Sequence, residues 1–107
     1  LHKLYNQIEN MDPEERLKFA LASYNVGYGH IKDARDIAHK KGFDINQWSS
    51  LEETLPLLRY REYYEKSDFG YARGTEPVRY VNRILIYFST RRLEYNFLVP
   101  IHAKPFN

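Results

Sequence analysis

The sequence predicts an all-α domain, and two observations carry this prediction. Apolar residues recur at helical spacing in several segments, each bounded by residues that start or stop helices. No segment shows the strict alternation of apolar and polar residues that is typical of a half-buried strand. With 107 residues, 43% of them hydrophobic, the chain can form one small domain with a modest core.

The first well-marked helix begins at Asp12 and Pro13. Aspartate can cap a helix, proline suits the first helical position, and Glu15 is placed to complete a capping box. Glycines at 27 and 29 predict that this helix ends between Asn25 and Gly29. The residues expected to share one face of it are Leu17, Ala20, Leu21 and Tyr24.

Two further helices are expected in the middle of the chain. The first covers about residues 28–41 and stops at Gly42. Its expected buried residues are Ile31, Ala34, Ile37 and Ala38. Ser49 or Ser50 is expected to cap the next, a short helix whose second half Pro56 leaves undecided. The apolar residues of this short helix are Leu51, Leu55 and Leu58.

A long loop is predicted between the short helix and the last one. Residues 59–75 show no period, are rich in tyrosine and contain Gly70 and Gly74. Long loops in compact domains are often functional. The tyrosines Tyr63, Tyr64 and Tyr71 could pack this loop onto the domain or stack on sugar rings, because aromatic faces bury apolar sugar surfaces.

The last helix is predicted to open at Glu76-Pro77 and to continue to about Arg91. Its apolar stripe consists of Val81, Ile84, Leu85 and Phe88. From Asn96 onwards, prolines at 100 and 105 predict an extended strap or a frayed end. We therefore expect a domain over residues 1–95 and a C-terminal tail over 96–107.

Composition excludes few classes of function. A net charge of +2 without a basic block gives no argument for a nucleic-acid partner. The chain has no cysteine, so it has no disulfide or thiolate chemistry. No apolar run approaches the roughly 18 to 20 residues that span a bilayer. The chain starts without methionine and residues 1–8 already follow a helical period, so we expect it to be a fragment.

Metal and carboxylate chemistry are not expected within this chain. The four histidines, His2, His30, His39 and His102, have no mutual spacing typical of a metal site, so no metal and no cofactor are expected. Glu14-Glu15 and Glu52-Glu53 lie in the first turns of helices, where the helix dipole accounts for them. We assign neither pair to catalysis.

The end of the first helix is unusual, because Tyr24-Asn25-Val26-Gly27 stands where a packing helix would normally carry leucine. A phenol, a carboxamide and a closely approachable backbone suit sugar hydroxyls and N-acetyl groups. The residues alone leave a structural alternative open, in which Tyr24 belongs to the core and Asn25 ends the helix in a left-handed conformation. Tyr80 of the last helix is open in the same way, as core or as ligand contact.

The segment Ala22-Ser23-Tyr24-Asn25-Val26-Gly27 resembles the A-x-Y-N-x-G motif of the lysozyme-like lytic transglycosylases, which cleave bacterial peptidoglycan. The resemblance covers roughly residues 4–88. Further blocks resemble a membrane-bound branch of that family, namely Leu55-Pro56-Leu57-Leu58, Tyr63-Tyr64, Gly70-Tyr71-Ala72-Arg73-Gly74 and Tyr80-Val81. The resemblance implies an all-α, lysozyme-like lobe that forms the C-terminal part of the catalytic domain.

The resemblance also implies a substrate site and a reaction. The residues that it assigns to glycan binding are Tyr24, Asn25, Gly27, Tyr28, Tyr71 and Tyr80. In the family, one glutamate cleaves the MurNAc-GlcNAc β-1,4 bond and closes a 1,6-anhydro ring. That glutamate belongs to a Glu-Ser pair upstream of the A-x-Y-N block, and this chain lacks it. The resemblance therefore implies no catalytic residue in this chain and an acid located before Leu1.

The implied partner is the peptidoglycan glycan strand, and the implied location is the bacterial cell envelope, either periplasm or outer membrane. Membrane anchoring through regions outside this chain, oligomeric state and exo or endo cleavage are left open. Two other readings remain. One is a non-catalytic glycan-binding module, and the other is a helical protein-binding or nucleic-acid-binding module, suggested by interleaved aromatic and basic residues in 59–79.

Overall fold

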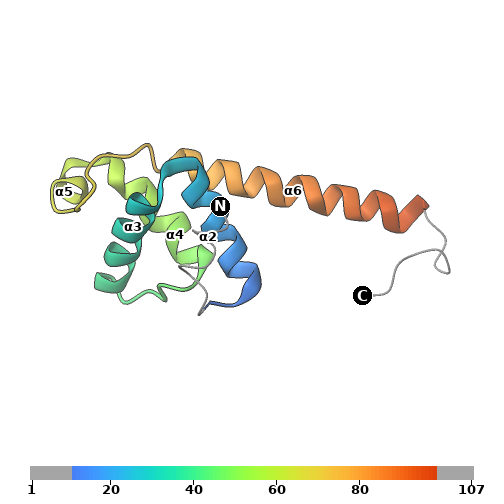
Figure 1. The fold of residues 1–107 in the computed structure, drawn as a ribbon, viewed down its shortest axis with the longest axis horizontal. Coiled ribbons are helices and arrows are strands. Elements are labelled where there is room, and N and C mark those ends of the chain that lie inside the picture. Colours follow the sequence, from blue (N-terminus) through green and yellow to red (C-terminus); the bar gives the residue numbers. More distant parts are fainter. Residues whose placement is uncertain (1–10, 99–107) are drawn as a thin grey trace.

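The computed structural model describes residues 11–98, and every regular element within them is helical (Figure 1). The elements in chain order are α2 (Pro13–Val26), α3 (Tyr28–Lys40), α4 (Trp48–Thr54), the 3-10 helix η1 (Leu55–Arg59), α5 (Arg61–Tyr64) and α6 (Thr75–Leu98). The all-α prediction is confirmed. The helical period expected over residues 1–8 and the tail from residue 99 onwards lie outside the described residues.

Helix α2 starts as predicted, but not with the predicted capping box. The Asp12 side chain accepts a hydrogen bond from the Glu14 backbone N–H at 3.0 Å. Glu15 does not reach back to Asp12. One of its carboxylate oxygens accepts the Trp48 backbone N–H at 2.8 Å, and the other forms an ion pair with Lys18 at 2.9 Å. Glu15 therefore caps the start of α4 and ties that helix to α2.

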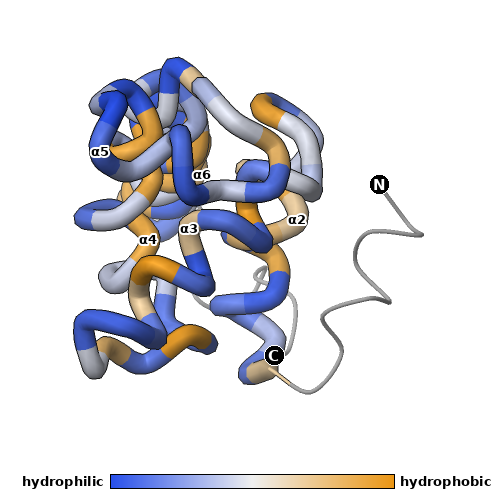
Figure 2. The backbone as a smooth tube through the Cα atoms, turned by 90° about the vertical axis from the view of Figure 1, so that its left-hand side faces the viewer, coloured by the Kyte–Doolittle hydropathy of each residue, from blue (hydrophilic) through white to orange (hydrophobic). Residues whose placement is uncertain are grey.

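The core lies where α2, α3, α4, η1 and α6 meet. Its large, fully buried side chains are Phe19, Ile31, Leu51, Leu55, Leu58 and Val81. The rings of Phe19 and Trp48 pack edge to face with centroids 6.1 Å apart. In Figure 2, hydrophobic residues occur in short stretches along the helices rather than in one continuous run, as expected for helices with one buried side.

The predicted apolar face of α2 is half right, because Ala20 is buried and Leu21 packs against the core. Leu17 and Tyr24 are 47% and 68% exposed, whereas Phe19, Ala22 and Ser23 are buried. The helix is turned so that Phe19 fills the space beside Trp48, and small side chains let α2 approach its neighbours closely. The Ser23 hydroxyl is satisfied within the helix, because it donates to the Phe19 carbonyl at 2.8 Å.

The middle helices follow the sequence more closely. All four residues expected to be buried on α3 are buried, and Gly42 follows it with a φ of 78°. Helix α4 begins at Trp48, before Ser49 and Ser50, because Glu15 supplies its cap from outside the segment. After Thr54 the chain continues as the 3-10 helix η1, in which Pro56 is accommodated near the start.

Helix α6 is longer than predicted. It runs past Arg91 to Leu98, so residues 96–98 are helical rather than extended. Val81 is fully buried as expected, but Phe88 is 64% exposed, and every residue from Ile86 to Leu98 is exposed. This half of the helix projects from the packed helices and gives the molecule its long dimension, 56 × 25 × 24 Å (Figure 1). Within residues 11–98, no helix combines the length and apolar character needed to cross a membrane.

Candidate functional site

Tyr24 and Asn25 lie in the last turn of α2 with exposed side chains, and Tyr24 is 68% exposed. The structural alternative for both residues is wrong. Tyr24 is outside the core, and Asn25 is helical, because only glycines have positive φ within residues 11–98. Gly27, with a φ of 99°, makes the turn between α2 and α3 instead. The side chains of Tyr24 and Asn25 are therefore available to a ligand.

The first turn of α3 forms the other side of this corner. Tyr28 is half-buried and packs against the core. Gly29 is covered by the loop, because a Cβ added to it would lie 2.6 Å from two ring carbons of Phe69. The N-cap residue of α3 is Gly27, which has no side chain to accept from the first backbone N–H groups of the helix. We call the surface made by Tyr24, Asn25, Gly27 and Tyr28 the α2–α3 corner.

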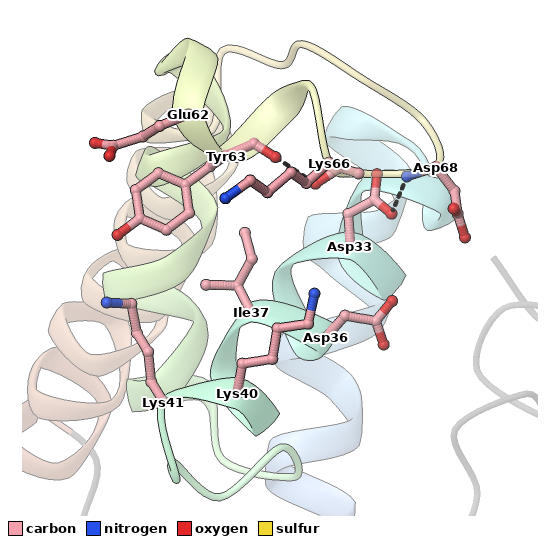
Figure 3. A pocket seen from close by; sticks show the side chains of 10 residues that line it. Asp33, Asp36, Ile37, Lys40, Lys41, Glu62, Tyr63, Lys66 and Asp68 are labelled. Atoms are coloured by element: carbon pink, nitrogen blue, oxygen red, sulfur yellow. Dashed lines mark hydrogen bonds between the residues drawn. The ribbon is translucent and has the colours of Figure 1, made fainter.

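A buried carboxylate holds the loop against the corner. Asp33 is 2% exposed, and its two oxygens accept the backbone N–H groups of Asp68 and Phe69 at 3.2 and 2.9 Å (Figure 3). Sequence reasoning missed this residue. The signal was present, because Asp33 lies between Ile31 and Ala34 and four residues before Ile37, on the apolar face of a predicted helix.

The rest of the segment from 59 to 75 is more ordered than the predicted loop. It contains helix α5, and the Ala72 backbone N–H donates to the Leu58 carbonyl at 3.2 Å. Gly74 lies directly on η1, where a Cβ would come within 1.7 Å of the Leu55 carbonyl oxygen. Tyr71 is 53% exposed and meets the Tyr64 ring edge to face, with centroids 5.7 Å apart. These contacts favour a packing role for Tyr64 and leave part of Tyr71 exposed.

Tyr80 lies near the start of α6, is half-buried and packs against the core. Helix α6 contacts α2, the helix that carries Tyr24 and Asn25. Four of the six residues assigned to glycan binding thus lie at the corner, between the last turn of α2 and the first turn of α3. Tyr71 lies in the segment that covers Gly29, and the convergence of Tyr80 on the corner stays a prediction.

The described carboxylates do not include a residue placed as a catalytic acid. A general acid needs an enclosed site and a proton to give. Asp33 is the buried carboxylate among residues 11–98, and both of its oxygens accept backbone N–H groups. Oxygens of Asp33, Asp36 and Asp68 lie within 4.8 Å of one another, but the last two residues are exposed. Asp33 is best explained as the anchor of the loop.

No protein-family model matches this chain, but curated proteins match most of it. A relative from Desulfosudis oleivorans is 57% identical over 90 residues, which is 83% of this chain and 20% of that protein. Relatives from Shewanella sediminis and Photobacterium profundum are 47% and 44% identical over 91 residues, 84% of this chain and 19% and 18% of those proteins.

This chain is therefore a homologue of a segment of the lytic transglycosylases, the class that its motifs and its all-α fold indicate. All three of these relatives are named membrane-bound lytic murein transglycosylase F. The chain spans about a fifth of the length of these relatives. The resemblance stated from the sequence is confirmed.

Proposed function

We propose that this chain is the C-terminal part of the catalytic domain of a peptidoglycan lytic transglycosylase. The identity to three proteins of that name over more than four-fifths of the chain supports the assignment. The words "membrane-bound" and "murein" in their names support a place in the bacterial cell envelope, in the periplasm or at the outer membrane. The glycan strand of peptidoglycan is the substrate of the whole protein.

The α2–α3 corner is one wall of the glycan cleft in this proposal. The observation that carries it is the exposure of Tyr24 and Asn25 at the end of a helix whose other face is buried. The Asn25 carboxamide can both donate to and accept from an N-acetyl group, and the Tyr24 ring can lie on an apolar sugar face. Tyr71 and Tyr80 complete the wall from the covering loop and from α6.

The acid comes from residues outside this chain. In the proposed reaction that acid protonates the glycosidic oxygen, and the bond from this oxygen to the anomeric carbon breaks. The same carboxylate then removes the proton of the sugar 6-hydroxyl, whose oxygen bonds to the anomeric carbon and closes the 1,6-anhydro ring. Residues of this chain position the saccharide and exclude water from one side, and they transfer no proton.

The test uses the isolated chain and purified peptidoglycan sacculi. We expect the chain to sediment with sacculi and to release no anhydro-muropeptide detectable by mass spectrometry. Tyr24→Ala and Asn25→Ala should reduce sedimentation. Tyr87→Ala is the matched control, because Tyr87 is a 54% exposed tyrosine of α6 that is not among the residues assigned to glycan binding.

Three outcomes would change the proposal. Anhydro product from the isolated chain would show that the acid lies within it. Equal loss of sedimentation in the Tyr87→Ala control would remove the corner as the binding surface. A parent gene without a Glu-Ser pair upstream of the chain would favour the non-catalytic glycan-binding module instead.

A further inference from the structure

A concave site lies apart from the residues that make up the α2–α3 corner. It is a cavity of about 330 Å³ between α3 and residues 62–68 (Figure 3). Its lining residues are Asp33, Asp36, Ile37, Lys40, Lys41, Glu62, Tyr63, Lys66, Ser67 and Asp68. Ligand pockets run from about 300 to 1,000 Å³, so this volume suits a ligand of two or three amino acids rather than a polymer.

The charges around the cavity are unpaired. Its rim carries three lysines and the exposed carboxylates Asp36, Glu62 and Asp68. Among the described residues, none of these six side chains takes part in an ion pair within 4.0 Å. Groups of both signs that stand around a hollow without pairing can each receive an opposite charge from a ligand.

Side chains of both charges line the cavity around one apolar residue. In Figure 3, the Lys66 and Lys40 side chains extend to either side of Ile37, which forms an apolar floor, whereas the carboxylates of Glu62 and Asp68 point outwards. Lys41 lies against the Tyr63 ring, with Nζ 5.6 Å from its centroid. The lysines beside this floor can therefore receive carboxylates on an aliphatic backbone. The carboxylates of Asp36 and Asp68, whose oxygens lie within 4.8 Å of each other, can receive an ammonium group.

Hydrogen bonds within the protein hold one wall of the cavity in place. Asp33 fixes Asp68 and the residue after it through two backbone N–H groups, and the Ser67 hydroxyl donates to the Tyr63 carbonyl at 3.0 Å. These bonds fix the wall opposite α3. A preformed wall lowers the ordering cost of binding.

We propose that this cavity binds a short peptide that carries free carboxylates and a free ammonium group, the chemistry of the peptide stem of peptidoglycan. The choice of ligand rests on the proposed function, since stems are attached to the glycan strands that the corner would bind. Lys40 and Lys66 receive the carboxylates, Ile37 and Tyr63 contact the aliphatic part, and Asp36 or Asp68 receives the ammonium group.

The experiment is an amide-resonance NMR titration of the 107-residue chain with the free tripeptide L-alanyl-γ-D-glutamyl-meso-diaminopimelate. We expect saturable shifts in residues 36–41 and 62–68. The double variant Lys40→Gln/Lys66→Gln should bind about tenfold more weakly, the equivalent of about 1.4 kcal/mol. Lys32→Gln is the control, because Lys32 is an exposed lysine of the same helix outside this cavity, and it should change affinity less than about twofold.

Parallel titrations separate the alternatives. Chitotetraose carries sugar without a stem, so its shifts belong at the corner, and their failure would count against the proposed function rather than this inference. Calcium chloride alone should not shift Asp33, Asp36 and Asp68 at millimolar concentration. Saturation by calcium with no response to the tripeptide, no tripeptide shifts, or equal binding by the double variant would each overturn the inference.

Discussion

Replacing Asp33 with alanine tests the structural link between the loop, the corner and the cavity. The substitution leaves the backbone N–H groups of Asp68 and Phe69 without their acceptor in a region where the carboxylate is 2% exposed. Each hydrogen bond to a charged group contributes about 1.5 to 3 kcal/mol, less where water reaches the released N–H. We therefore expect Asp33→Ala to lower the free energy of unfolding by about 2 to 4 kcal/mol.

The assay is urea unfolding followed by circular dichroism and by the fluorescence of Trp48, the single tryptophan, which is 3% exposed. Asp36→Ala is the control, because Asp36 is an exposed carboxylate one turn further along the same helix. It should change stability by less than about 0.5 kcal/mol. Asp33→Asn keeps one acceptor oxygen, so the stability of this variant should lie between those of Asp33→Ala and Asp36→Ala. Equal stability of the Asp33→Ala and Asp36→Ala chains would refute the anchoring role.

Three other substitutions have definite expected outcomes in the same unfolding assay. Glu15→Ala removes the acceptor of the Trp48 backbone N–H and should cost about 1 to 3 kcal/mol, and Glu15→Gln should recover most of it. Gly74→Ala should lower the free energy of unfolding by about 1 to 3 kcal/mol, because the added Cβ would lie 1.7 Å from the Leu55 carbonyl oxygen. A neutral result would contradict this packing. Tyr24→Ala should change stability by less than about 0.5 kcal/mol because the side chain is exposed, and a loss above about 2 kcal/mol would return Tyr24 to the core.

The sequence predicted helices well where the signals for them are local. Asp12 and Pro13 marked the start of α2, glycines marked the ends of α2 and α3, and period-matched residues such as Ile37 and Leu58 are buried as expected. Each of these signals depends on neighbours within a few residues. Capping residues and helical spacing act over that range, so they can be read without knowing the tertiary structure.

Most of the errors involve partners distant in the chain, apart from the greater length of α6 and the exposure of Phe88. The start of α4 depends on Glu15, which lies 33 residues before Trp48, and the loop position depends on Asp33, which lies 35 residues before Asp68. The packing of Phe19 on Trp48 decides which side of α2 is buried, and the helical period alone does not predict this contact. The candidate site was predictable at Tyr24 and the residue after it because their motif is contiguous. The covering of Gly29 by a distant aromatic ring was not.

The central claim is that the α2–α3 corner binds the glycan strand, and an NMR titration with chitotetraose tests it most directly. We expect millimolar affinity, about 4 kcal/mol, because one wall of a cleft leaves most of the ligand in water. Shifts should centre on Tyr24, Asn25 and Tyr28 and include Tyr80, and Asn25→Ala should weaken binding by about 0.5 to 1.5 kcal/mol. Shifts confined to residues 59–79 and unchanged by Asn25→Ala would contradict the claim and make the corner a structural cap.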